Sequence, residues 1–214
     1  MNKNMLEIGG VSVEQLAKSC QTPLYIYDEE KISTKLAQFH DLFQSDALET
    51  EVLYASKAFT CKALLELVKQ HGLSLDVVSG GELYVAKQAD FPMERVYFHG
   101  NNKLPSEIEY ALENGVENFV IDNFYEIDLV QEIASRLGVK INGIVRITPG
   151  VYAGGHDYIR VGAKDTKFGF SSHDNTYLKA IKKVIDAPNI NFDGIHCHVG
   201  SQIEDIQAYV LAMN

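Results

Sequence analysis

The sequence has 214 residues, of which 46% are hydrophobic and 22% charged, a composition typical of one soluble globular domain with a sizeable core. Its formal charge of −10, from 19 basic and 29 acidic residues, argues against binding to nucleic acid or to an anionic membrane, since either partner needs a basic surface. No signal-peptide-like start and no stretch of roughly 20 apolar residues is present, and the three cysteines are too few for a disulfide framework. These features predict a cytoplasmic protein.

Short apolar segments alternate with amphipathic segments along most of the chain. The apolar segments are rich in Val, Ile, Tyr and Phe and predict strands at 23–27, 51–56, 74–78, 95–99, 118–122, 143–147 and 192–199. Apolar residues at helical spacing predict helices at 62–71, 81–88, 105–114, 123–137 and 177–186. This alternation favours an α/β fold with a parallel sheet and right-handed crossovers.

The number of predicted strands leaves two architectures open. After the first, edge-like strand, six strands of the βα type remain, whereas a closed barrel needs eight and typically about 250 residues. The fold is therefore either an open doubly wound sheet or a barrel without its last two units. No GxGxxG follows an early strand and no GxxxxGK[ST] occurs, which disfavours a nucleotide-binding doubly wound fold. The glycine-rich stretch 148–172 predicts a long functional loop.

Lys57 directly follows the predicted strand 51–56. Active sites of parallel βα barrels lie at this end of the strands. A lysine among apolar and aromatic neighbours can have a lowered pKa and act as an imine-forming amine. Position alone leaves open a lysine that simply reaches solvent.

Asp76 and Glu82 flank the end of the next predicted strand, on either side of Gly80 and Gly81. An aspartate inside a strand is disfavoured unless a partner pairs with it, and the two glycines permit a tight turn close to a ligand. Glu82 could equally be a first-turn carboxylate that complements a helix dipole.

His196 and His198 stand two residues apart on a predicted strand, so we expect their side chains on the same face, where they could line a barrel mouth. No clear third and fourth ligands accompany them, and no metal is expected. Ser201 follows in a strand-end turn and offers a hydroxyl to a polar ligand. Arg146, inside the strand 143–147, needs a carboxylate or phosphate partner.

Seven segments in a fixed order resemble the fold-type III pyridoxal-phosphate enzymes, the alanine-racemase-like barrels. They are YASKAFTCKALL, GLSLDVVSGGEL, VYFHGNNK, IDN, VRITPGV, DYIRVGAKDTKFGF and GIHCHVGSQI. Within these enzymes the segments HGNNK, KFGF and HCHVGSQI are most similar to the diaminopimelate decarboxylases. Ser56 departs from the usual valine and Phe59 from the usual asparagine of the lysine motif.

The resemblance implies a role for each matching residue. Lys57 would hold pyridoxal 5'-phosphate covalently, His198 would stack on the pyridine ring, and Ser201 would lie on the phosphate side. Arg146 resembles the strand arginine that supports the acidic partner of the pyridine nitrogen.

Two further parts of the site follow from the same resemblance. Asp76 and Glu82 resemble the acidic pair near the cofactor and its lysine, and residues 165–170 belong to the substrate-side loop.

The resemblance also implies a TIM-type (β/α)8 barrel that is incomplete at the C-terminus, with about six of eight strands and without the C-terminal β-domain. Residues 1–30 would carry a strand of that missing domain, and 31–214 a partial cofactor-binding barrel. Family enzymes are about twice as long and contain a phosphate loop and an acidic partner for the pyridine nitrogen beyond this region. We therefore expect Arg146 to lack its partner and the chain alone to be inactive.

The implied activity is decarboxylation of meso-2,6-diaminopimelate, a small amino acid, to L-lysine by a homodimer with shared active sites. Alternatives are a decarboxylase of the same fold acting on ornithine, arginine or carboxynorspermidine, a non-catalytic pyridoxal-phosphate carrier, and an interaction module with a dead site.

Overall fold

A parallel sheet forms the centre of the computed structural model, which describes residues 6–150, 167–201, 203 and 205–213. The strands run in the order β3 (Leu53–Ala55), β4 (Ser74–Val77), β5 (Val96–Phe98), β6 (Asn118–Ile121) and β7 (Ile141–Thr148). β7 then pairs with both β9 (Ile190–Cys197) and the two-residue β8 (Phe170–Ser171). Every pairing in this sheet is parallel, as the alternation predicted, and no pairing among the described residues joins β9 back to β3.

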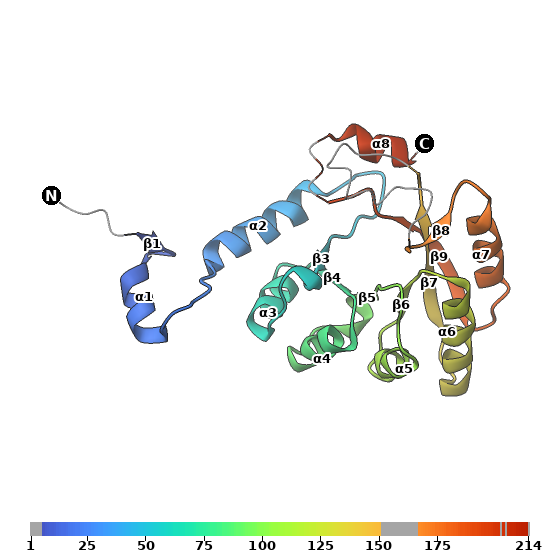
Figure 1. The fold of residues 1–214 in the computed structure, drawn as a ribbon, viewed down its shortest axis with the longest axis horizontal. Helices are drawn as coiled ribbons and strands as arrows, with labels where there is room; N and C mark the ends of the chain where they lie inside the picture. The colour runs from blue at the N-terminus through green and yellow to red at the C-terminus, as the bar shows by residue number, and fades with distance from the viewer. Residues whose placement is uncertain (1–5, 151–166, 202, 204, 214) are drawn as a thin grey trace.

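Helices follow the strands along the outer side of the curved row (Figure 1). They are α3 (Lys62–Gln70), α4 (Gly80–Gln88), α5 (Pro105–Glu113), α6 (Phe124–Leu137) and α7 (Thr176–Ile185), each within a residue or two of its predicted bounds. The last helix, α8 (Gln207–Met213), lies apart from this outer row (Figure 1). No helix among the described residues is long and apolar enough to cross a membrane.

The core lies between the strands and the outer helices. In β4, Leu75 and Val77 are fully buried, and successive residues of a strand face opposite sides, so Asp76 faces away from this core. Phe98 of β5 and Phe119 of β6 pack together, with ring centroids 5.8 Å apart. The sheet thus buries one face against helices and directs polar side chains to the other.

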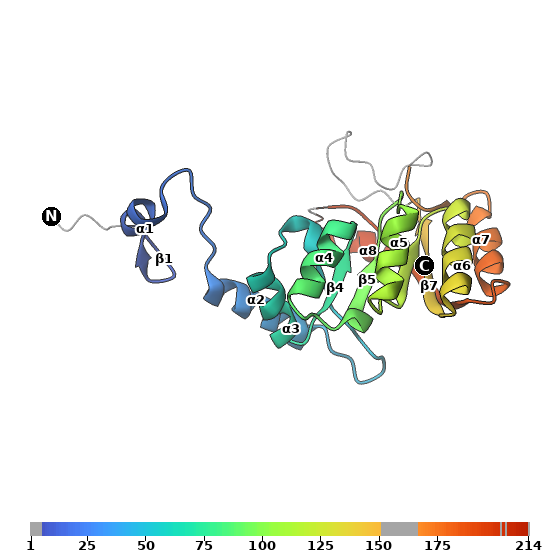
Figure 2. The ribbon, with the colours of Figure 1, turned by 90° about the horizontal axis from the view of Figure 1, so that it is seen from below.

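The N-terminal part extends away from the sheet (Figure 2). It contains β1 (Glu7–Ile8), β2 (Val11–Ser12) and α1 (Val13–Cys20), followed by α2 (Glu29–Leu42), which was not predicted. The side chain of Asp28 accepts a hydrogen bond from the Lys31 amide and caps α2. The division at residue 30 stays a prediction.

The predicted strand at 23–27 is wrong. This segment has no strand pairing, and its Tyr25 is 89% exposed. Its residues have strand propensity, but a strand needs a neighbour to satisfy its backbone hydrogen bonds, and the described residues provide none there.

Candidate functional site

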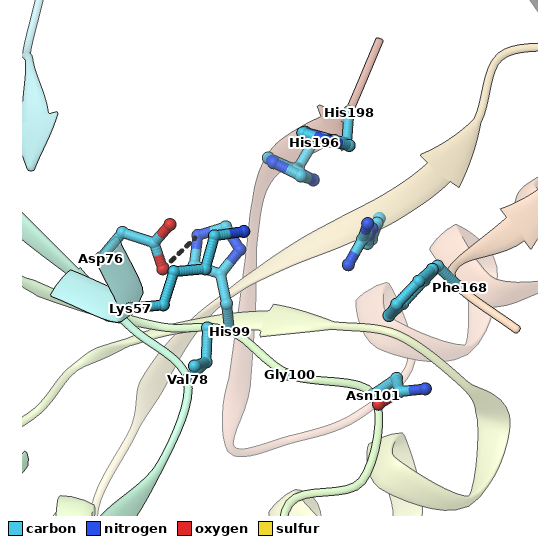
Figure 3. A pocket seen from close by; sticks show the side chains of 10 residues that line it. Lys57, Asp76, Val78, His99, Gly100, Asn101, Phe168, His196 and His198 are labelled. Atoms are coloured by element: carbon cyan, nitrogen blue, oxygen red, sulfur yellow. Dashed lines mark ion pairs between the residues drawn. The ribbon is translucent and has the colours of Figure 1, made fainter. Parts of the chain in front are cut away.

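A pocket of about 460 Å³ opens at the carboxyl ends of the strands (Figure 3). Residues from the turn after β3, from the ends of β4 and β5, and from the end of β9 contribute to it. Its lining residues are Lys57, Asp76, Val78, His99, Gly100, Asn101, Arg146, Phe168, His196 and His198. A lysine, an arginine and one carboxyl group among these side chains suit an anionic ligand, and Phe168 and the histidines suit an aromatic one.

Lys57 lies in a short 3-10 turn, Ser56–Ala58, immediately after β3, and its side chain reaches into the pocket (Figure 3). The Ser56 hydroxyl donates to the Glu82 carboxylate, which also accepts a hydrogen bond from the Val78 amide at 3.0 Å. The Tyr54 hydroxyl donates to the carbonyl of Phe59 at 2.9 Å. The turn that carries the lysine is therefore fixed from both sides.

Glu82 lies close to the lysine turn, as the resemblance suggests for the acidic pair, and its role toward the cofactor stays a prediction. It is not among the residues that line the pocket, and its carboxylate is engaged by Ser56, Val78 and Ser79. Its described contacts join the Lys57 turn to the end of β4. Ser201 is exposed and likewise lies outside the pocket lining.

Asp76 and the two histidines His99 and His196 form one wall of the pocket (Figure 3). The rings of His99 and His196 meet edge to face, with centroids 4.9 Å apart. The buried atoms Asp76 Oδ1 and His196 Nδ1 have no hydrogen-bond partner among the described residues. A polar ligand in this pocket would find both atoms available.

Burial disfavours charge on this wall. It raises the pKa of Asp76 to about 6, an effect that the Lys57 ammonium partly opposes. Burial lowers the pKa of His99 to about 2 and that of His196 to about 4, and nearby cations add to both shifts. Both imidazoles are therefore neutral at neutral pH. The pKa of His198 is also lowered, first by burial and then by Arg146 and Lys57.

Arg146 has a carboxylate partner among the described residues. The expectation that it lacks the family's acidic partner of the pyridine nitrogen stays a prediction. The Arg146 guanidinium donates to Asp122 Oδ1 at 3.3 Å, and Asp122 is buried at the end of β6. The guanidinium carbon also lies 4.5 Å from the ring centre of Phe168, a cation–π contact. The partner was missed because Asp122 precedes a predicted helix, where an acidic residue has an ordinary capping explanation.

The structure brings together four of the six predicted site residues: Lys57, Asp76, Arg146 and His198. The same-face prediction for His196 and His198 is confirmed, since both line the pocket. Among the described residues no group of three or more His, Cys, Asp and Glu side chains could hold a metal ion.

Four lining residues were not predicted: Val78, His99, Gly100 and Asn101. All lie in segments that carried the resemblance, and His99 directly follows β5. Phe168 was expected only as part of the loop 165–170. Of the predicted substrate-side loop 165–170, residues 165 and 166 lie outside the described residues.

A family model described as the pyridoxal binding domain of pyridoxal-dependent decarboxylases matches residues 29–214. The diaminopimelate decarboxylase of Bacillus subtilis (strain 168) is 49% identical over 207 residues, which cover 97% of this chain and 47% of the relative. That of Staphylococcus aureus (strain COL) is 42% identical over 205 residues, covering 96% and 48%. The chain spans about half the length of the curated relatives it matches.

Solved structures agree with these relatives. The diaminopimelate decarboxylase of M. jannaschii in complex with L-lysine superposes with a TM-score of 0.86 at 34% identity, over 98% of this chain and 49% of that one. The Helicobacter pylori enzyme with L-lysine gives 0.81 at 29% identity, over 93% and 50%. The parallel sheet and its outer helices thus match the N-terminal α/β barrel region of these structures.

Proposed function

Because the chain belongs to the pyridoxal-dependent decarboxylase family, we propose that it forms the Lys57-bearing part of a diaminopimelate decarboxylase. The reaction removes one carboxylate of meso-2,6-diaminopimelate as CO2 and yields L-lysine. The observation that carries the proposal is the place of Lys57 in a strand-end pocket of a chain up to 49% identical to diaminopimelate decarboxylases.

The residues around the pocket fit pyridoxal 5'-phosphate. Lys57 offers an amine for covalent attachment, His198 and Phe168 offer ring faces, and Arg146 offers positive charge to an anionic group. The unpaired buried oxygen of Asp76 and the ring nitrogen of His196 are available to polar atoms of a ligand. These observations support the cofactor assignment.

The bound cofactor supplies an aldehyde that takes the substrate amine and a ring that accepts the electrons left when CO2 departs. The chain's own residues prepare this chemistry. The Glu82 contacts hold the Lys57 turn at the pocket, and the carboxyl group of Asp76, with its pKa raised to about 6, can take up and release a proton close to neutral pH. The neutral imidazoles of His99 and His196 add no positive charge there.

The experiment is a CO2-release assay on a protein that joins this chain to the C-terminal half of the Bacillus subtilis relative, with pyridoxal phosphate added. We expect meso-2,6-diaminopimelate to be decarboxylated, ornithine and arginine to be poor substrates, and the chain alone to be inactive. Lys57→Ala should abolish release, whereas Lys62→Ala, on the exposed first turn of α3, should leave it unchanged. Faster release from ornithine or arginine would contradict the proposed substrate.

We further propose a cytoplasmic homodimer with shared active sites for the whole enzyme. Exposed apolar side chains on α8 and β9, such as Leu211 and Ile195, support a covered surface there. Light scattering on the joined protein should give twice the chain mass.

A further inference from the structure

Lys103, the last residue of the HGNNK segment, forms a buried ion pair with Glu126 of α6. Their side chains are 1% and 4% exposed, and Nζ lies 2.5 Å from Oε1. Nζ also donates to the carbonyls of Gly100 at 2.9 Å and Val120 at 2.7 Å, so all three of its hydrogens have acceptors.

The stability of the fold does not by itself account for this pair. Removing two charges from water is costly, and apolar residues of similar volume often serve a protein's stability as well or better. Burial raises the pKa of Glu126, and the Lys103 ammonium opposes that shift. The contacts of the pair give a more specific explanation.

One set of contacts leads to the pocket through the β5–α5 loop. Gly100, whose carbonyl Lys103 binds, and its neighbour Asn101 both line the pocket (Figure 3). The side-chain nitrogen of Asn123 donates to the backbone carbonyl of Asn101 at 3.3 Å. Its side-chain oxygen accepts from the backbone amide of Glu126 and so caps α6. This loop is therefore tied to the start of α6.

A second set leads to Arg146. Oε2 of Glu126 accepts a hydrogen bond from the Asp122 amide at 3.0 Å. The side chain of Asp122 then holds Arg146 through Oδ1 and the Gly169 amide through Oδ2 at 3.0 Å. Gly169 follows Phe168, which lies against Arg146 in the pocket wall.

We propose that Lys103 is a positioning residue which, with Glu126, holds the Gly100 loop and the Asp122–Arg146 pair in place around the pocket. The part of this inference that concerns cofactor affinity rests on the proposed function. The part that concerns the pocket wall does not, because it can be measured without the cofactor.

The test compares a charge-free variant with a destabilised control. Lys103→Met combined with Glu126→Leu removes both charges, keeps similar volume and leaves the carbonyls of Gly100 and Val120 and the Asp122 amide without their partners. Val68→Ala, in α3 and fully buried, opens a cavity on the helical side of the sheet. Two quantities are measured on each: hydrogen exchange of the Gly169 amide without cofactor, and the Kd for pyridoxal phosphate.

We expect the double variant, whose three backbone groups lose their partners, to fall in Tm by about as much as Val68→Ala, while its Gly169 amide exchanges about tenfold faster and its Kd rises about tenfold. Val68→Ala should lower Tm by roughly 5 °C and leave both quantities near wild type. If Lys103 and Glu126 had only a structural role, the exchange rate of the Gly169 amide and the Kd would change in proportion to the loss of Tm in both variants. If the double variant does not fold, Lys103→Met combined with Glu126→Gln provides the same test, because glutamine is neutral and keeps an acceptor oxygen for the Asp122 amide.

Unchanged exchange at Gly169 in the folded variant would overturn the inference. Faster exchange with unchanged Kd would overturn its functional part. If the wild-type protein does not bind pyridoxal phosphate at all, the proposed function fails, and the exchange measurement still decides whether Lys103 positions the wall.

Discussion

Nε2 of His99 lies 3.7 Å from Oδ1 of Asp76 across the wall of the pocket. This distance is too long for a hydrogen bond, and the buried Asp76 oxygen has no partner among the described residues. Burial gives the histidine a pKa of about 2 and the aspartate a pKa of about 6, so the pair does not consist of two opposite charges at neutral pH. The two groups respond to pH in opposite ways.

We expect the unfolding free energy of Asp76→Asn to gain on that of the wild type as the pH rises. The pKa of Asp76 is higher in the folded chain than its ordinary value of 3.8, so its favourable contribution is present below that value and is lost as the pH rises through about 6. Between about pH 5 and pH 8 the wild type should lose roughly 1 kcal/mol of unfolding free energy relative to Asp76→Asn. Urea unfolding at both pH values measures the difference. If the unfolding free energies of the two proteins change with pH in parallel, burial does not raise the pKa of Asp76.

The reverse dependence is expected for His99→Asn. The folded pKa of His99 lies below its ordinary value of 6.5, so its contribution is complete above that value and is lost as the pH falls below it. From about pH 8 to pH 5 the wild type should lose roughly 2 kcal/mol relative to the variant. His71→Asn, on a partly exposed residue after α3, is the control. If His99→Asn and His71→Asn have the same pH profile, the buried neutral imidazole is not the cause.

Gly169→Ala should destabilise the chain more than Gly138→Ala. Both glycines have φ +69°, so either substitution places a side chain in the left-handed region at a cost of about 1 kcal/mol. A Cβ at Gly169 would lie 2.8 Å from the Arg146 carbonyl oxygen, whereas one at Gly138 meets nothing within 4 Å. The clash should add a further ~1–2 kcal/mol. Equal unfolding free energies in urea would contradict this contact.

Most strands of the sheet and the helices that cover it could be predicted. The strand segments are short and rich in β-branched residues, and the segments between them have apolar residues at helical spacing. The segment 23–27 has the same composition, yet it forms no strand, since strand formation depends on a neighbour that local sequence does not reveal. α2 was missed although Ile32, Leu36 and Phe39 stand at helical spacing and Asp28 is a good capping residue, so the signal for this helix was present in the sequence.

The candidate site could be predicted in part because strand ends meet at one edge of a parallel sheet. This rule located Lys57, Asp76 and His198. It gives no side-chain direction inside loops, so Lys103 and Asn101 were overlooked, and the hydrogen bonds of Glu82 to Ser56 and Val78 could not be foreseen. Contacts such as Glu126 with the Asp122 amide depend on packing between neighbouring strand ends, which sequence spacing alone does not give.

Lys57 is proposed as the cofactor-binding lysine of this pocket. The most direct test of this role is to incubate the chain with pyridoxal phosphate, reduce it with borohydride and map the adducts by mass spectrometry. We expect one dominant adduct on Lys57, which is lost in Lys57→Ala and retained in Lys62→Ala. Labelling spread over many exposed lysines, with no preference for Lys57, would contradict it.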